Sequence, residues 1–199
     1  EADAVRKQLR PYLVHRSTGR PYVVVKLAST LDGRLAAPDG TSRWITGPDA
    51  RADVHRLRAE SDAIVVGAGT VRADDPALTV RDAVGPDPER IVLGHAPAGA
   101  RIRPCREHDG PLGDLLDQLG AEGCLQLMVE GGAAVAAAFH RARLVDRYVV
   151  YVAPKIMGGD DGVAMFAGEG VATMSDVWSG RFDGVTQLGD DIRLDVVPA

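Results

Sequence analysis

The chain has 199 residues, a formal net charge of −5 at pH 7 and 45% hydrophobic residues, which is typical of one domain that buries a core without disulfides or metals. The negative charge, the 5% aromatic content and the lack of an apolar run of about 18 residues argue against a nucleic-acid binder and a membrane protein. Cys105 and Cys124 show no C-x-x-C spacing and fit a reducing compartment, and no signal peptide is visible. We therefore expect a cytoplasmic protein.

Residues 1–20 are polar and rich in arginine, and we expect an N-terminal arm or linker with a short helix near residues 5–9. Residues 21–199 are expected to form a single domain. Runs of aliphatic and β-branched residues between glycine, proline and polar turns predict buried strands. The predicted strands cover residues 22–28, 62–67, 90–93, 125–130 and 147–153, and a pair of strands within 176–197 turns near residues 189–190.

Helices are predicted between these strands. Pro48 and Asp49 are helix start signals, Pro76 breaks a short helix that ends near Asp74, and Gly120 is expected to end a leucine-rich helix. An alanine-rich helix is predicted from Gly132 to about residue 143. Residues 33–43 and 158–170 are expected to be loops, and residues 94–113 show no clear element. The alternation of strands and helices predicts an α/β fold with a mostly parallel sheet and an antiparallel edge at the C-terminal end.

Lys26 interrupts the first predicted strand and is one of three lysines, against 20 arginines. The alternation of a strand places it on the same face as Val24 and Ala28. A cation at such a position is costly unless it meets a partner or faces a cleft. Two interpretations stay open: an ammonium that reaches past the strand end to solvent, or a group that binds substrate or transfers a proton.

Two glycine-containing turns follow predicted strands. Glycines 131 and 132 follow Glu130 and precede a helix, whose first turn offers unpaired N–H groups and a positive dipole end suited to a pyrophosphate. A plain tight turn is the alternative. The second turn begins G-x-G at Gly67, but Arg72 replaces the third glycine of the dinucleotide fingerprint. Only Thr70 is singled out there, as a donor to a phosphate.

The pair Asp74 and Asp75 is suited to proton transfer or to hydrogen bonding a heterocycle, although for Asp75 an Asp-Pro turn with a solvated acid is the preferred interpretation.

Arg51, His55 and Arg58 lie on one stripe of the first predicted helix of the domain, which suits a phosphate monoester or simply a solvated face. Ser42 and Trp44 precede this helix and would border the same cleft; for an isolated tryptophan such as Trp44, packing into the core is the preferred interpretation.

Several motifs are missing from the sequence. It has no G-x-x-x-x-G-K-[ST], no H-E-x-x-H and no G-x-S-x-G, which argues against an ordinary P-loop kinase, the common zinc hydrolases and an α/β-hydrolase. No paired His/Cys spacing occurs, so no metal site is expected.

Six sequence blocks follow one another along the chain: KLASTLDG (26–33), SRWIT (42–46), VGAGT (66–70), ADDPALTVR (73–81), VEGG (129–132) and APKIMGG (153–159). Read in order, they resemble the pyrimidine reductases of riboflavin biosynthesis, which are dihydrofolate-reductase-like enzymes. The resemblance spans about residues 20–197, and the ADDPALTVR block is the most specific. It implies a central sheet of about eight strands with helices on both faces.

In bacteria this reductase is often fused behind a zinc-dependent deaminase, and residues 1–20 are similar to the segment that joins the two. The deaminase motifs H-x-E and P-C-x-x-C are missing here. The resemblance therefore implies a stand-alone reductase or a reductase domain alone.

The resemblance also implies an oxidoreductase that uses NADPH. Its substrate would be 5-amino-6-(5-phosphoribosylamino)uracil, or the related diamino-pyrimidinone, whose ribosyl group is reduced to the ribityl product. The cofactor would cross the carboxyl ends of the strands and deliver a hydride to C1 of the ribose after ring opening to an imine. A cytoplasmic homodimer is implied as well, with no nucleic-acid or membrane partner.

Roles follow position by position from the resemblance. Lys26 and Asp74 are expected nearest the chemistry, as catalytic groups. The positions that match substrate contacts are Ser42, Arg58, Leu78, Arg81 and Glu130. The positions that match the cofactor side are Ala28, Trp44, Thr70, Asp74, Gly131, Gly132, Ala133, Ala134 and Val135, the glycine-alanine run extending to Ala138.

One pair departs from the family pattern. After the third strand the family has an Asp followed by Ser, Thr or Arg near the adenosine end of the cofactor, and this chain has Gly94-His95. The departure leaves the choice between NADPH and NADH open, with His95, Arg101 or Arg103 as compensating groups. It also leaves open a reductase of another pyrimidine or pterin on the same scaffold, or a non-catalytic nucleotide-binding module.

Overall fold

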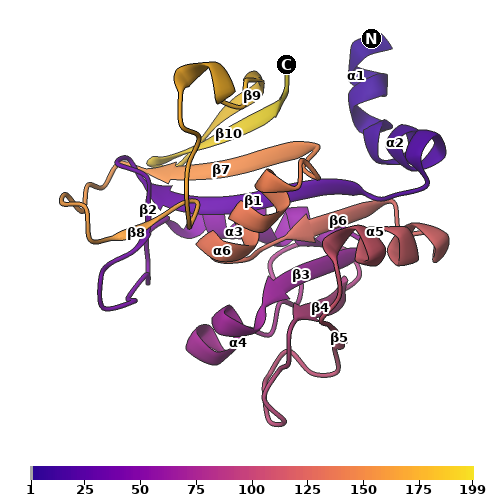
Figure 1. Cartoon of the computed structure of the whole chain (residues 1–199), viewed down its shortest axis with the longest axis horizontal. Coiled ribbons are helices and arrows are strands. Elements are labelled where there is room, and N and C mark those ends of the chain that lie inside the picture. Colours follow the sequence, from indigo (N-terminus) through magenta and orange to yellow (C-terminus); the bar gives the residue numbers. More distant parts are fainter. Residues whose placement is uncertain (1) are drawn as a thin grey trace. The chain divides into compact units, whose positions relative to one another are not determined.

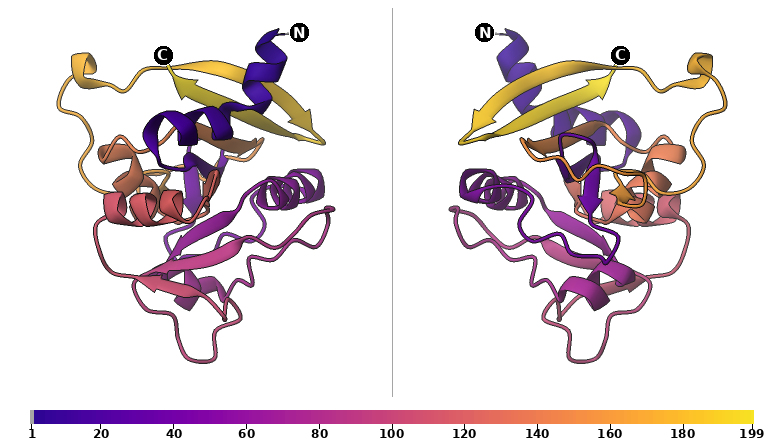
Figure 2. Two further views of the ribbon diagram at one scale, coloured as in Figure 1. Left: turned by 90° about the vertical axis from the view of Figure 1, so that its right-hand side faces the viewer. Right: turned by 90° about the vertical axis from the view of Figure 1, so that its left-hand side faces the viewer.

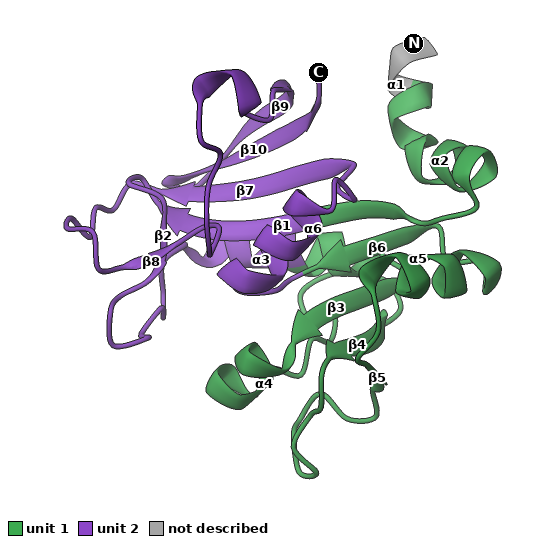
Figure 3. Ribbon diagram, viewed as in Figure 1, with its two compact units in different colours: residues 1–24, 55–129 green, residues 25–54, 130–199 purple. Residues whose placement is uncertain are grey.

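The structure is a computed structural model that describes residues 2–199, with side chains from residue 5 onward (Figure 1). The chain forms two compact units (Figure 3). Unit 1 contains residues 1–24 and 55–129, and unit 2 contains residues 25–54 and 130–199. The strand order is β5-β4-β3-β6-β1-β7-β10-β9, with a separate pair β2-β8, and β1 contributes residues to both units.

Unit 1 is built on parallel strands. Strand β3 pairs in parallel with β4 and with β6, and β4 pairs in parallel with β5. Every residue of β3 is buried, as expected for a parallel strand that is covered on both faces. The elements of this unit are α1 (Ala2–Gln8), α2 (Arg10–Thr18), β3 (Ala63–Gly67), α4 (Ala68–Asp74), β4 (Glu89–Leu93), β5 (Arg106–His108), α5 (Leu112–Ala121) and β6 (Gln126–Val129).

Unit 2 is closed by antiparallel strands. Strand β10 pairs antiparallel with both β7 and β9, and Figure 2 shows the β9–β10 pair as two long neighbouring arrows. The elements of this unit are β2 (Arg34–Ala36), α6 (Ala133–Arg141), β7 (Arg147–Ala153), β8 (Val163–Ala164), the 3₁₀ helix η1 (Met174–Asp176), β9 (Gly180–Leu188) and β10 (Asp191–Pro198). The elements that continue from one unit into the other are β1 (Tyr22–Thr30) and α3 (Pro48–Ala59).

Helices cover both faces of strand β7. The Tyr151 hydroxyl donates to Asp53 of α3 over 2.7 Å, whereas the Tyr148 hydroxyl lies 2.7 Å from the ring nitrogen Nδ1 of His140 on α6. Successive odd and even residues of a strand point to opposite faces, so α3 and α6 lie on opposite sides of β7. The predicted α/β class is confirmed, with its mostly parallel sheet of eight strands and its antiparallel C-terminal edge.

Several expectations need correction. The segments expected as loops, 33–43 and 158–170, contain the short strands β2 and β8, and the unassigned segment 94–113 contains β5. The N-terminal arm forms two helices where one short helix was expected. These elements have two to nine residues, and the strands among them are too short to show a hydrophobic period.

Gly120 lies inside α5 and does not end it. A Cβ at this position would overlap the backbone carbonyl of Gly19, so the glycine permits the arm to approach α5 closely. Arg20 pairs there with Asp117 through two hydrogen bonds of 2.6 and 2.9 Å, and His15 Nε2 lies 3.0 Å from the Gly120 carbonyl. The arm is therefore packed against α5 within unit 1.

Within residues 2–199, no helix combines the length and the apolar character that crossing a bilayer requires.

Candidate active site

In unit 2, Lys26 of β1 meets a carboxylate. Lys26 Nζ lies 3.4 Å from Glu130 Oε1, and the two side chains are only 15% and 16% exposed. The interpretation of Lys26 as an ammonium that reaches solvent is therefore wrong. The Glu130 carboxylate stabilises the partly buried ammonium of Lys26. The two residues are 104 positions apart in the sequence. The pair offers one ammonium and one carboxylate with limited access to water, which is a chemistry suited to holding a proton beside a substrate.

The turn after Glu130 leads directly into α6. Gly132 caps the helix in an extended conformation, and its carbonyl accepts the N–H groups of Val135 and Ala136, both over 3.1 Å. The first N–H groups of a helix lack a carbonyl four residues before them within the helix, and the positive end of the helix dipole lies there. The side chain of Ala134 is small and exposed. This end of α6 has the features of an anion site.

The two glycines of this turn differ. A Cβ on Gly131 would lie 2.5 Å from the Cβ of Val135, so contact within the chain already requires a glycine at that position. Gly132 has φ −70°, which any residue adopts. The need for Gly131 is therefore explained without a ligand, and the case for an anion site rests on the helix end itself.

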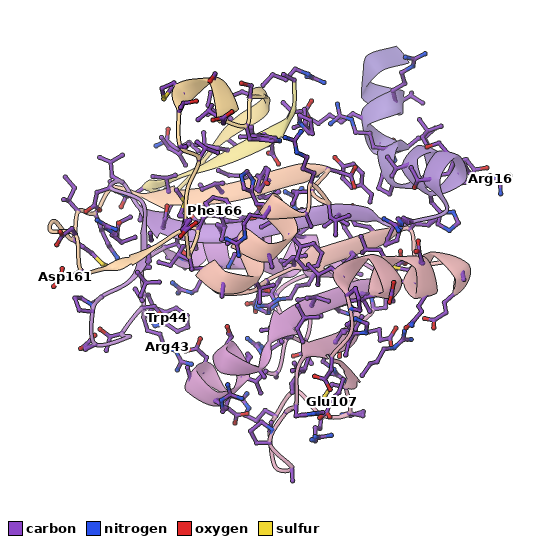
Figure 4. The ribbon with its side chains drawn as sticks, viewed as in Figure 1. Arg16, Arg43, Trp44, Glu107, Asp161 and Phe166 are labelled. Atoms are coloured by element: carbon purple, nitrogen blue, oxygen red, sulfur yellow. The ribbon has the colours of Figure 1, made fainter. Side chains whose placement is uncertain are left out.

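Trp44 is 63% exposed, so the interpretation that it packs into the core is wrong. The Arg51 guanidinium lies 4.5 Å from the centre of its ring, in a cation–π contact. The Trp44 carbonyl accepts a hydrogen bond of 2.7 Å from Lys155 Nζ. Arg51 also donates to the Thr46 carbonyl over 2.8 Å. Ser42 is half-buried in the same loop. Figure 4 shows the Trp44 ring projecting from this loop beside Arg43.

Asp32, which sequence reasoning did not single out, orders the loop after β7. Its carboxylate accepts hydrogen bonds from the Thr30 hydroxyl (2.6 Å), Gly158 N–H (2.9 Å) and Met157 N–H (3.2 Å). These bonds, with that of Thr30 the largest cause, lower the pKa of Asp32 to about 2. The only sequence signal for this role is the Asp-Gly turn at the end of the first family block.

In unit 1, the segment after α4 has an unusual backbone. Asp75 and Leu78 have φ angles of 41° and 52°, a region that non-glycine residues rarely adopt. Leu78 is buried at 4% exposure, and Asp75 Oδ1 accepts the Arg101 N–H over 2.8 Å. Asp75 is thus half-buried and bonded, and it is not a solvated acid as expected. Strain of this kind is concentrated at functional sites.

Thr70 and Asp74 lie on α4 in the same unit. Thr70 is half-buried near the start of the helix, and Asp74 is its exposed last residue.

The basic stripe of α3 is not a solvated face. His55 is 6% exposed and accepts the Arg81 N–H at Nδ1 over 3.2 Å, which places its proton on Nε2, 3.5 Å from Asp82 Oδ2. Arg58 is 9% exposed and donates to the Thr79 carbonyl over 3.2 Å. Arg81 is exposed, with a weak 3.4 Å contact to Thr79 Oγ1. His55 and Arg58 therefore position residues 79–81, and the structural role of His55 was missed.

Each unit brings part of the predicted set together. Unit 2 gathers Lys26 and Glu130 at the turn into α6, and its loop before α3 holds Ser42 and Trp44. Unit 1 gathers Arg58, Leu78 and Arg81 around one strained segment. Within the described part of the chain, no group of three or more His, Cys, Asp or Glu side chains is placed to hold a metal ion.

The strand order, the closing antiparallel strands and the helix that begins at Gly132 define a dihydrofolate-reductase-like α/β protein. Residues 21–103 and 110–194 match the family described as the RibD C-terminal domain, and the chain belongs to this family.

Curated relatives in this family are longer than the chain. It is 40% identical to the riboflavin biosynthesis protein RibD of Mycobacterium tuberculosis over 202 residues, which cover 95% of this chain and 58% of the relative. The Escherichia coli RibD is 34% identical and is covered to 63%. The chain thus spans about three fifths of these relatives.

Solved structures show the same fold. The chain is similar to RibD of Acinetobacter baumannii with a TM-score of 0.90 and 34% identity, covering 99% of this chain and 63% of that one. The riboflavin biosynthesis reductase Rib7 of Saccharomyces cerevisiae has a TM-score of 0.70 at 20% identity, covering 98% and 99% of the two chains, and supports the fold alone. The resemblance that the sequence blocks predict is confirmed.

Proposed function

We propose that the chain is the reductase of riboflavin biosynthesis that reduces the ribosyl group of 5-amino-6-(5-phosphoribosylamino)uracil with NADPH. Family membership supports the proposal, as does a solved relative from Thermotoga maritima, 27% identical, whose name describes a deaminase and 5-amino-6-(5-phosphoribosylamino)uracil reductase. The observation that carries it is the partly buried Lys26–Glu130 pair directly before the turn into α6.

The reaction needs a dinucleotide site, and the residues of unit 2 fit one. The first turn of α6 presents backbone N–H groups between small side chains, and Gly132, Ala133 and Ala134 leave room for a pyrophosphate there. The exposed ring of Trp44 and the small side chain of Ala28 are the other cofactor-side positions in this unit. When bound, the cofactor supplies the hydride for C1 of the opened ribose.

The remaining chemistry is the management of protons. Opening the ribosylamine moves one proton from the amine nitrogen to the ring oxygen, and reduction of the resulting imine then requires one proton at nitrogen. Lys26 carries protons and is held by Glu130 in a site with limited water. We assign Lys26 to this proton, with Asp74 at the end of α4 as the second polar group.

In unit 1, Arg58 and Arg81 are assigned to the substrate phosphate. A guanidinium forms strong charge-assisted hydrogen bonds with a phosphate monoester. Arg81 is exposed, and the strained segment that includes buried Leu78 orients it. Thr70, near the start of α4, is assigned to the cofactor side.

The test is turnover by the purified chain. NADPH with the phosphoribosylamino-pyrimidine is expected to lose its nicotinamide absorbance, and Lys26→Met to lower the rate by about 100-fold or more, as removal of a general acid does. Lys7→Met, which removes a lysine of α1, is the matched control and is expected to retain full activity. Lack of turnover with this substrate and with its diamino analogue, or full activity of Lys26→Met, contradicts the proposal.

We also propose that the enzyme is a cytoplasmic homodimer that associates through the edge strand β9. This strand ends the sheet order and carries Phe182 and Val185 at 67% and 63% exposure. An open strand edge with large apolar side chains is prone to pair with another copy. Sedimentation is expected to give a dimer for the wild type and a monomer for Phe182→Lys. A monomeric wild type contradicts the proposed homodimer.

A further inference from the structure

The carboxyl ends of three parallel strands meet beside His95. In the registers of unit 1, Gly67 of β3 pairs with Leu93 of β4, which pairs with His108 of β5. The Gly94 N–H donates to the His108 carbonyl over 2.9 Å, and His95 follows at once. A Cβ on Gly94 would lie 3.3 Å from that of Ala68, where the chain turns into α4. Dinucleotides bind across the carboxyl ends of open parallel sheets, so this edge is suited to the adenosine half.

His95 is held between two carboxylates at this edge. Its Nδ1 lies 2.9 Å from Glu107 Oε2 and its Nε2 lies 3.1 Å from Asp109 Oδ2. The imidazole is 76% exposed. Both ring nitrogens donate only in the charged form, so this geometry fits an imidazolium. Figure 4 shows the Glu107 side chain on β5.

Arg103 completes the cluster. Its Nη2 lies 2.7 Å from Glu107 Oε1, and its guanidinium also donates to the carbonyls of Ala96 (2.7 Å) and Pro97 (3.0 Å). The guanidinium is therefore occupied within the loop after β4. With His95 charged, two cations balance two carboxylates; with His95 neutral, the cluster carries one net negative charge.

This balance decides which dinucleotide the edge tolerates. A carboxylate at the end of a parallel strand accepts a hydrogen bond from the ribose 2′-hydroxyl, whereas a 2′-phosphate requires positive charge. A phosphate monoester brings about 1.5 to 2 negative charges at pH 7. With His95 neutral, the excess negative charge of the cluster would therefore repel NADPH and accept NADH.

We propose that the imidazolium of His95, by neutralising Glu107 and Asp109, makes this strand edge compatible with a 2′-phosphate and so sets the preference for NADPH over NADH. The inference rests on the proposed function, because that function requires the chain to bind a nicotinamide dinucleotide. The cluster of His95, Arg103, Glu107 and Asp109 would then determine cofactor specificity. His95 belongs to the pair Gly94-His95, which departs from the family pattern.

The cluster makes the preference depend on pH. The groups that face His95 are Glu107 on β5 and Asp109 after it, with Arg103 bonded to Glu107. The hydrogen bond with Glu107, the largest cause, and the charge of Asp109 raise the pKa of His95 above its usual range. His95 thus keeps its charge to a higher pH than an isolated imidazole and loses it as the pH rises further, where the 2′-phosphate is already doubly ionised because its second pKa is about 6.

The experiment compares the dissociation constants of NADPH and NADH for the whole chain by fluorescence titration from pH 7 to pH 9 at low salt. The wild-type preference for NADPH is expected to fall about five- to tenfold across this range, the usual size for one partly screened charge. His95→Gln is expected to show the lowered preference at pH 7 with a flat pH profile. Asp109→Asn is expected to increase the preference for NADPH.

Asp117→Asn is the matched control, because it removes an exposed carboxylate of α5 that pairs with Arg20 and is not bonded to the His95 cluster. The control is expected to keep the wild-type preference and its pH profile. The inference is overturned when NADPH and NADH bind but His95→Gln retains the wild-type preference, or when its profile keeps the wild-type slope. Binding of neither dinucleotide to the wild type overturns the proposed function together with the inference.

Discussion

Strand β3 of unit 1 and strand β10 of unit 2 handle polar groups in opposite ways. Strand β3 is buried along its whole length and consists of Ala, Ile, Val and Gly, with no charged residue within it. In unit 2, β1 carries Lys26 and β10 carries Arg193 and Asp195 within the strands. A parallel strand covered on both faces, such as β3, excludes charge, whereas the antiparallel strand β10 keeps Arg193 and Asp195 buried because they are paired.

The charges inside unit 2 form one connected network. Arg193 Nη1 donates to Asp53 Oδ2 over 2.6 Å, and its Nε and Nη2 both lie 3.1 Å from the Asp195 carboxylate. Arg147 pairs with the same Asp195 carboxylate, and the Tyr151 hydroxyl donates to Asp53 over 2.7 Å. Burial, the largest cause, raises the pKa of Tyr151 well above its usual value. Two cations and two carboxylates thus balance between α3, β7 and β10.

The largest effect on stability is expected from breaking this network. Arg193→Met removes the Arg193 guanidinium from both Asp53 and Asp195, and removal of one partner of a buried pair costs about 3 to 5 kcal/mol. Urea unfolding followed by circular dichroism measures the loss. Arg20→Met, which breaks an exposed pair with Asp117, is the control and is expected to change stability little. Equal losses for both variants would remove the contrast between paired interior charge and surface charge.

A smaller loss is expected from the apolar interior of unit 1. Ile64 of β3 has no exposed surface, and Ile64→Ala removes buried methyl groups and leaves a cavity, at about 3 kcal/mol. Ile64→Val is the matched control, at about 1 kcal/mol. The same unfolding measurement applies to both. A loss for Ile64→Ala no greater than that for Ile64→Val would mean that β3 is not closely packed.

The smallest effect is expected at Asp32, which lies on the surface of unit 2. Its folded pKa of about 2 is below the unfolded value of about 3.9, so the carboxylate contributes stability that is complete above pH 4 to 5 and is lost as the pH falls through about 2. Thermal unfolding of the wild type and Asp32→Asn is expected to differ at pH 6 and to converge toward pH 2. A constant difference over this range would show that the charge of Asp32 does not matter.

Long elements were predictable from sequence because they carry a periodic or continuous apolar signal. Strand β7 matches its predicted bounds, 147–153, and β1 extends the predicted strand by two residues. Strands β2, β5 and β8 have two or three residues and show no period, so tertiary pairing alone defines them.

The site was predictable only in part. The helical spacing of Arg51, His55 and Arg58 was correct, but spacing does not tell which face is covered, and burial of His55 and Arg58 required the structure. The partner of Lys26 lies 104 residues away, and no local pattern reports such a pairing. The resemblance assigned Glu130 to substrate binding but did not predict its contact with Lys26.

Strand β1 and helix α3 each pass from one unit to the other, so neither unit is a continuous stretch of polypeptide. During synthesis, unit 1 has all its residues only after residue 129 has left the ribosome, while residues 25–54 still await the segment that begins at residue 130. A single cut in the chain therefore cannot release either half intact. Unit 1 can therefore assemble before residues 130–199 are made, whereas unit 2 has to join an early segment of the chain to its last one.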